Sequence, residues 1–158
     1  IEILSEEGIS VDLLMLGDGP ELAKHQEFAR ASNYRDRFVM AGKVKSKDLP
    51  ELTATADIGT VLVPDLGLSY RYLLPNKIFE YVQAGLSLLC SPFPELASIA
   101  LGKNIGLCAD PKNEIAISKA INQMLAPGWR DTRKANFRLA AEELCWENEK
   151  NQFIRYFS

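Results

Sequence analysis

The chain has 158 residues, of which 47% are hydrophobic and 25% are charged, with a formal net charge of −3. This composition fits one globular domain, and the acidic balance argues against a nucleic-acid partner, which normally requires a basic face. The three cysteines are odd in number and far apart, so they predict buried thiols in a reducing compartment and no disulfide framework. No apolar stretch approaches the roughly 20 residues that cross a bilayer.

The chain opens without an initiator methionine, and its first residues read as the end of a helix capped by Gly8. We therefore expect a fragment of a longer protein. Short apolar runs then alternate with helical patterns. The predicted strands are 11–16, 37–41, 58–63, 87–90 and 105–108; the predicted helices are 20–31, 46–56, 75–84, 94–101 and, with a break at 127–128, most of 113–157.

Five short apolar strands separated by helices predict a single α/β domain over residues 1–158, with a mostly parallel sheet. Ligands of such sheets bind outside the carboxyl ends of the strands. We expect this edge at residues 16–17, 41–42, 63–64 and 90–91, with a loop over 64–74.

Two glycines follow the first predicted strand, in the sequence Gly-Asp-Gly-Pro. Gly17 and Gly19 allow a ligand to approach the backbone closely, and the helix that begins at Pro20 offers free N–H groups to an anion. A tight strand-to-helix turn explains the same residues. This short motif therefore leaves both interpretations open.

The helix that starts near Pro75 carries Lys77 in its first turn, where a cation opposes the helix dipole. A bound phosphate reverses that effect, although a lysine in water is the simple alternative. Glu80 lies three residues further on, on the same face of a helix that we expect to be well buried. A buried carboxylate needs a partner, which is either a cap or salt bridge, or the two hydroxyls of a ribose.

Several segments, in their order and spacing, resemble the C-terminal domain of GT-B glycosyltransferases, specifically the large retaining group called family 4 or group 1. The similar segments are Gly17-Asp-Gly-Pro20, Phe38-Val-Met-Ala-Gly42, Ala56-Asp-Ile58 before a strand ending in Pro64, Pro75-Asn-Lys-Ile-Phe-Glu-Tyr81, Ala84-Gly-Leu86, and Trp146-Glu147 leading into Tyr156. The resemblance covers nearly the whole chain. It implies a Rossmann-like three-layer α/β domain, the C-terminal half of a GT-B fold, truncated at its N-terminus.

The resemblance implies a donor-binding domain of a hexosyltransferase that uses a nucleotide-sugar, such as a UDP- or GDP-sugar, without a metal ion. The acceptor, a glycan or lipid-linked molecule of polysaccharide or cell-envelope synthesis, then binds the missing N-terminal domain, so this fragment alone is expected to be inactive. The implied location is the cytoplasm, with the inner membrane face as the alternative for the parent. A missing central strand implies exposed sheet edges that recruit a second chain.

By resemblance, Glu80 binds the ribose, the loop 73–76 offers N–H groups to the diphosphate, and the turn 42–44 faces the base. Tyr72 stands where the family carries a second glutamate near the transferred sugar, so no catalytic residue is assigned. Two other functions stay open: a nucleotide-sugar epimerase of the same fold, and a non-catalytic Rossmann-like binding module. The predicted nucleotide-sugar site comprises Gly17, Gly19, Gly42, Lys43, Val44, Tyr72, Leu74, Pro75, Asn76, Lys77 and Glu80.

Overall fold

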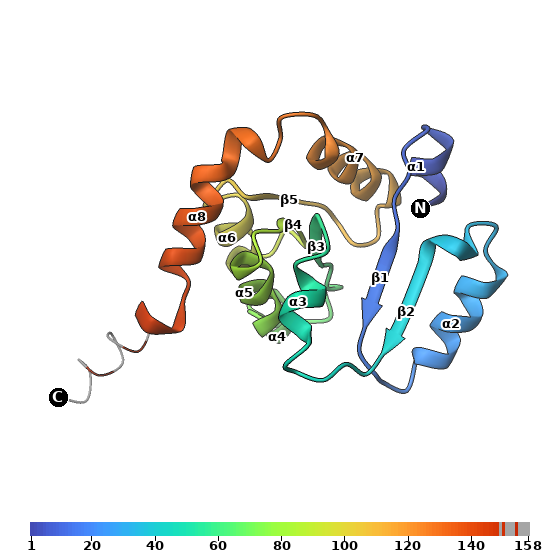
Figure 1. Ribbon diagram of the computed structural model, residues 1–158, viewed down its shortest axis with the longest axis horizontal. Coiled ribbons are helices and arrows are strands. Elements are labelled where there is room, and N and C mark those ends of the chain that lie inside the picture. The colour runs from blue at the N-terminus through green and yellow to red at the C-terminus, as the bar shows by residue number, and fades with distance from the viewer. Residues whose placement is uncertain (149, 151–153, 155–158) are drawn as a thin grey trace. The chain divides into compact units, whose positions relative to one another are not determined.

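A computed structural model describes residues 1–148, 150 and 154, and shows helices alternating with short parallel strands (Figure 1). The chain divides into two compact units, Ile1–Leu52 and Thr53–Ser158, and each is described by itself. Most of the amphipathic stretch predicted over 146–157 lies outside the described residues.

The first unit contains a two-stranded parallel sheet. Its strands pair from Leu13 opposite Phe38 to Met15 opposite Met40. The helix at the start of the chain ends as the sequence predicts: Gly8 has a positive φ of 77°, which favours glycine, and follows the last turn as its cap. The elements are α1 (Glu2–Glu6), β1 (Leu13–Leu16), α2 (Leu22–Ala31), the 3₁₀ helix η1 (Arg35–Arg37) and β2 (Phe38–Gly42).

The second unit contains a three-stranded parallel sheet in the order β3-β4-β5, so that β4 is central. A short helix, α3 (Leu49–Thr53), lies at the boundary between the units. The remaining elements are β3 (Ile58–Val61), α4 (Leu68–Arg71), α5 (Asn76–Gln83), β4 (Ser87–Cys90), α6 (Pro94–Ala100), β5 (Gly106–Cys108), α7 (Glu114–Leu125), the 3₁₀ helix η2 (Asp131–Arg133) and α8 (Lys134–Glu143).

The core of the second unit has helices on both faces of β4. Leu88 and Cys90 belong to a cluster with residues of α5, α6 and α8. Leu89 points the other way, into a cluster with residues of α7 and with Trp129. Every residue of β4 is at most 1% exposed. The continuous apolar run at 87–90 is thus explained by a strand covered on both faces, and the three-layer arrangement is present in this unit.

The structure confirms the α/β class, the parallel strands and the five strand positions, with bounds that differ by one or two residues. The strands form two sheets, β1-β2 in the first unit and β3-β4-β5 in the second. Within the described residues, no strand pairs with the second edge of β1 or of β3. The predicted loop over 64–74 also contains the short helix α4. The prediction of one domain over 1–158 stays a prediction.

Candidate functional site

The candidate site in the second unit is the start of α5, which follows the carboxyl end of β3. Pro75 precedes the helix in an extended conformation, and no side chain caps the helix. In the described part of the chain, the backbone N–H groups of Leu74, Asn76 and Lys77 have no hydrogen-bond partner, whereas that of Leu73 donates to the Tyr70 carbonyl at 3.3 Å. Three amides are therefore free to bind an anion, one fewer than a fully open 73–77 segment would offer.

Lys77 and Glu80 are both exposed, and neither forms an ion pair with a described residue. The expectation that Glu80 is buried and needs a partner was wrong. Ile78 and Val82 form the buried face of α5. Glu80 is two residues from each, about 200° around the helix, so its carboxylate points to the outer face. It is free to accept hydrogen bonds from water or from a ligand.

A close contact between Gly59 of β3 and Tyr81 of α5 determines how closely the helix packs on the strand. A Cβ atom added to Gly59 would lie 2.4 Å from two carbon atoms of the Tyr81 side chain, closer than real Cβ contacts. Only glycine therefore lets α5 pack at this depth on β3. Burial raises the pKa of the half-buried Tyr81 phenol, and the negative charge of neighbouring Glu80 raises it further.

The loop between β3 and α5 is fixed at its first residues by Ser91. The buried Ser91 hydroxyl donates to the Val63 carbonyl at 2.8 Å, and its oxygen accepts from the Val63 N–H at 2.7 Å. One side chain at the end of β4 thus satisfies both backbone groups of a residue just after β3. This contact sets where the loop leaves the sheet.

Further along the same loop, Asp65 and Arg71 form a bidentate ion pair. Arg71 Nε lies 3.0 and 2.9 Å from the two Asp65 carboxylate oxygens, and Nη2 lies 2.7 Å from Oδ2. The hydrogen bonds from Arg71 lower the pKa of the Asp65 carboxyl. This pair is not among the residues predicted from the sequence; the available signal was two opposite charges on either side of Gly67.

In the first unit, the structure brings Gly17 and Gly42 together at the ends of β1 and β2. The Gly17 N–H donates to the Gly42 carbonyl at 2.8 Å. Both glycines have positive φ angles, 134° and 64°, which other residues rarely adopt. Gly19 and Lys43 are exposed, and Val44 is half-buried. Helix α2 begins at Leu22, two residues after Pro20, so the predicted helix start was slightly early.

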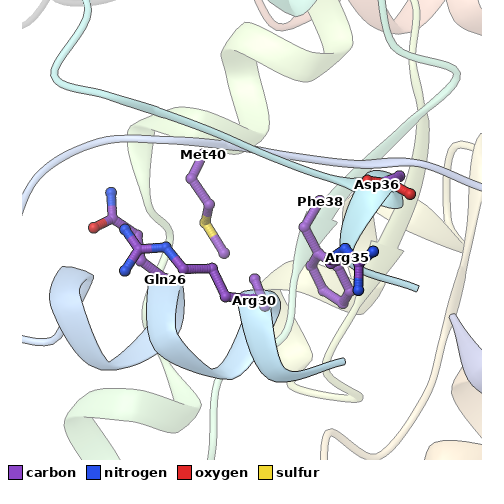
Figure 2. Close-up of a pocket in the computed structure, with 7 residues that line it drawn as sticks. Gln26, Arg30, Arg35, Asp36, Phe38 and Met40 are labelled. Atoms are coloured by element: carbon purple, nitrogen blue, oxygen red, sulfur yellow. The ribbon is translucent and has the colours of Figure 1, made fainter. Parts of the chain in front are cut away.

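A shallow pocket of about 350 Å³ lies in the first unit between α2, η1 and β2. Figure 2 shows the side chains of Phe38 and Met40 directed toward α2, with arginines at the rim. None of the predicted nucleotide-sugar residues lines this pocket. The lining residues are Gln26, Ala29, Arg30, Arg35, Asp36, Phe38 and Met40.

Two of the three cysteines, Cys90 and Cys108, are in an environment that disfavours the reactive thiolate. Cys90 is opposite Cys108 in the parallel pairing of β4 and β5. Burial raises the pKa of the Cys90 thiol to about 12 and also raises that of Cys108. Among the described residues, no group of three or more His, Cys, Asp or Glu side chains is arranged to hold a metal ion. No described helix has the length and apolar character needed to cross a membrane.

Parallel strands joined by helices, with glycine turns and a free helix start at strand ends, define a Rossmann-like α/β protein. The family model described as "Glycosyl transferases group 1" matches residues 1–127, and the chain belongs to this family. No curated protein matches the chain.

Two solved structures share the fold. Sucrose-phosphate synthase from Thermosynechococcus elongatus aligns with a TM-score of 0.71 and 20% identity, over 92% of this chain and 38% of its own. WaaG, a glycosyltransferase involved in lipopolysaccharide biosynthesis, aligns with a TM-score of 0.69 and 19% identity, over 90% of this chain and 37% of its own. The chain thus spans less than two fifths of either protein. These similarities confirm the fold class that the sequence predicted, the GT-B type of α/β domain.

Proposed function

We propose that this chain is the donor-binding domain of a glycosyltransferase, at the C-terminal end of a retaining, family 4 type enzyme. Its function is to bind a nucleotide-sugar whose sugar, a hexose, is transferred to an acceptor. Membership in the group 1 family supports the reaction class. The observation that carries the proposal is the start of α5, where uncapped amides, Lys77 and Glu80 all lie exposed and unpaired among the described residues.

The start of α5 supplies groups suited to a nucleoside diphosphate. The free N–H groups of Leu74, Asn76 and Lys77, together with the helix dipole and the Lys77 ammonium, attract the diphosphate. Glu80 lies three residues further on, about 4.5 Å along the helix axis, and accepts hydrogen bonds from the ribose hydroxyls. Because these diphosphate-binding groups are hydrogen-bond donors and a cation, they do not suit a metal ion, and we expect none.

The rest of the site follows from the same assignment. The turn 42–44, held beside Gly17, faces the base, and Gly19 lies in the adjoining turn. Tyr72 and Pro75 border the transferred sugar and the diphosphate. The acceptor, a glycan or lipid-linked molecule of cell-envelope polysaccharide synthesis, binds another part of the enzyme, in the cytoplasm at the inner membrane face. The free edges of β1 and β3 provide a route to self-association.

Calorimetric titration of UDP and GDP, and of their 2′-deoxy forms, tests the ribose assignment. Hydrogen bonds to a charged group contribute about 1.5–3 kcal/mol, and the exposure of Glu80 favours the lower end. Glu80→Ala is therefore expected to weaken binding by about tenfold, and Glu80→Gln by less. The matched control is Glu95→Ala, which removes an exposed, unpaired glutamate from the first turn of α6 and should leave affinity unchanged.

The deoxy ligands separate a ribose contact from a general electrostatic effect. Loss of a ribose hydroxyl should cost wild type most of the affinity that Glu80 contributes, and Glu80→Ala little. An equal loss in both proteins would show that Glu80 does not contact the ribose. A wild-type chain that binds neither UDP nor GDP would refute the proposed function itself.

A further inference from the structure

We propose that the Asp65–Arg71 ion pair is a positioning device that holds the loop 66–76 so that the free amides at its end meet the diphosphate. This inference rests on the proposed function. Neither residue is assigned to touch the ligand: both act through the backbone that follows them.

The loop is held at both ends, and the Asp65–Arg71 ion pair connects two points within it. Ser91 fixes its start at Val63, and α5 fixes its end at Asn76. Between these points, the three close nitrogen–oxygen contacts of the ion pair tie residue 65 to residue 71. The bidentate geometry constrains orientation as well as distance, because the planar guanidinium must match the plane of the carboxylate.

The backbone between the paired residues is arranged around the same contact. The Gly67 N–H donates to Asp65 Oδ1 at 3.4 Å, and the Gly67 carbonyl accepts from the N–H groups of Tyr70 and Arg71 at 3.0 and 3.2 Å. Gly67 has a φ of 133°, a value that favours glycine. This turn directs the chain into α4 and brings Arg71 back to Asp65, so the ion pair closes a structured turn.

Positioning is favoured over direct binding because the Arg71 nitrogens Nε and Nη2 already donate to Asp65. After Arg71, the Tyr72 N–H donates to the Leu68 carbonyl at 3.1 Å. Leu73 is also bonded within the loop, and the next free N–H is that of Leu74. The ion pair therefore fixes the last internally bonded turn directly before the proposed diphosphate site.

The test combines Arg71→Gln, Asp65→Asn and the double variant that carries both changes. Because exposed ion pairs are weak, each single variant should weaken UDP or GDP binding by about two- to fivefold. The double variant should lose no more affinity than either single variant, because both changes break the same ion pair. Hydrogen–deuterium exchange should rise at residues 66–76 in both single variants. The matched control is Glu142→Gln, which removes the exposed Arg138–Glu142 pair of α8 and should change neither measurement.

Each alternative has its own result. Tighter binding by Asp65→Asn, or a double variant whose loss equals the sum of the two single losses, would mean that Arg71 acts on the diphosphate apart from Asp65, which overturns the positioning role. Equal affinity of wild type and both single variants also overturns it, while leaving the proposed function intact. If wild type binds no nucleoside diphosphate, the proposed function fails. Unchanged hydrogen exchange at 66–76 in Arg71→Gln refutes the loop-ordering role without any ligand.

Discussion

Replacing Ser91 by alanine should destabilise the second unit selectively, because one hydroxyl serves two backbone groups. Ser91→Ala removes both the hydrogen bond to the Val63 carbonyl and the one from the Val63 N–H. Each such bond contributes about 0.5–1.5 kcal/mol, so the expected loss in free energy of unfolding is about 1–3 kcal/mol. With a urea dependence of about 2 kcal/mol per molar, a loss near the middle of that range lowers the urea midpoint by about 1 M.

Tryptophan fluorescence in urea reports this change, because both tryptophans of the chain, Trp129 and Trp146, belong to the second unit. Trp129 is buried in its core and changes environment on unfolding. Ser118→Ala is the matched control. Ser118 is also buried, but its hydroxyl has no hydrogen-bond partner among the described residues, so its removal should be neutral or slightly stabilising. Equal midpoint shifts in Ser91→Ala and Ser118→Ala would refute the reasoning.

Two further predictions concern alkaline stability and self-association. Burial raises the pKa of Cys90 from 9.0 to about 12, so the folded state keeps a proton that the unfolded state releases. This stabilisation is complete below pH 9 and is lost as the pH rises toward 12, by up to about 1.4 kcal/mol per pH unit. Between pH 8 and 11, the urea midpoint should fall less steeply with pH in Cys90→Ala than in wild type. If it falls equally steeply in both proteins, the assignment to Cys90 is contradicted. The backbone N–H groups of Ser87 and Ser91 donate to the Asp57 and Val61 carbonyls. In this parallel pairing, the backbone groups of Ile58 and Thr60 therefore face away from β4, toward the free edge of β3. Sedimentation velocity should show wild-type dimers at high concentration, and the charge that Thr60→Lys adds at this edge should prevent them. If both proteins stay monomeric at every concentration, dimerisation through this edge is excluded.

The sequence alone was sufficient for the strands and the family, because both depend on local patterns in order. Alternation of short apolar runs with helical periodicity located all five strands. The order of the strands within each sheet was not predictable in this way, since an apolar run does not specify which strand lies beside it. Glu80 shows a different limit. Its apolar neighbours in sequence indicated burial, but helical rotation by about 100° per residue places it opposite Ile78 and Val82.

Contacts that shape the candidate site join residues too distant in sequence for a local pattern to reveal. Ser91 and Val63 are 28 residues apart, and nothing in either segment marks them as partners. Asp65 and Arg71 are only six apart, yet their pairing depends on the turn at Gly67, which a loop composition does not define. Gly17 and Gly42 lie 25 residues apart, and their hydrogen bond follows only from the pairing of β1 with β2.

The sharing of β4 between two hydrophobic clusters has a consequence for how the molecule opens. Because Leu88 and Cys90 support one cluster and Leu89 the other, separation of β4 from either neighbour exposes both faces to water together. The layers of the second unit therefore form one cooperative block. The buried apolar residues described in the first unit are only Leu4 and Ala29. Local opening of the first unit therefore costs less free energy. Strands β1 and β2, which carry the glycine turns, can open while α5 stays packed on β3.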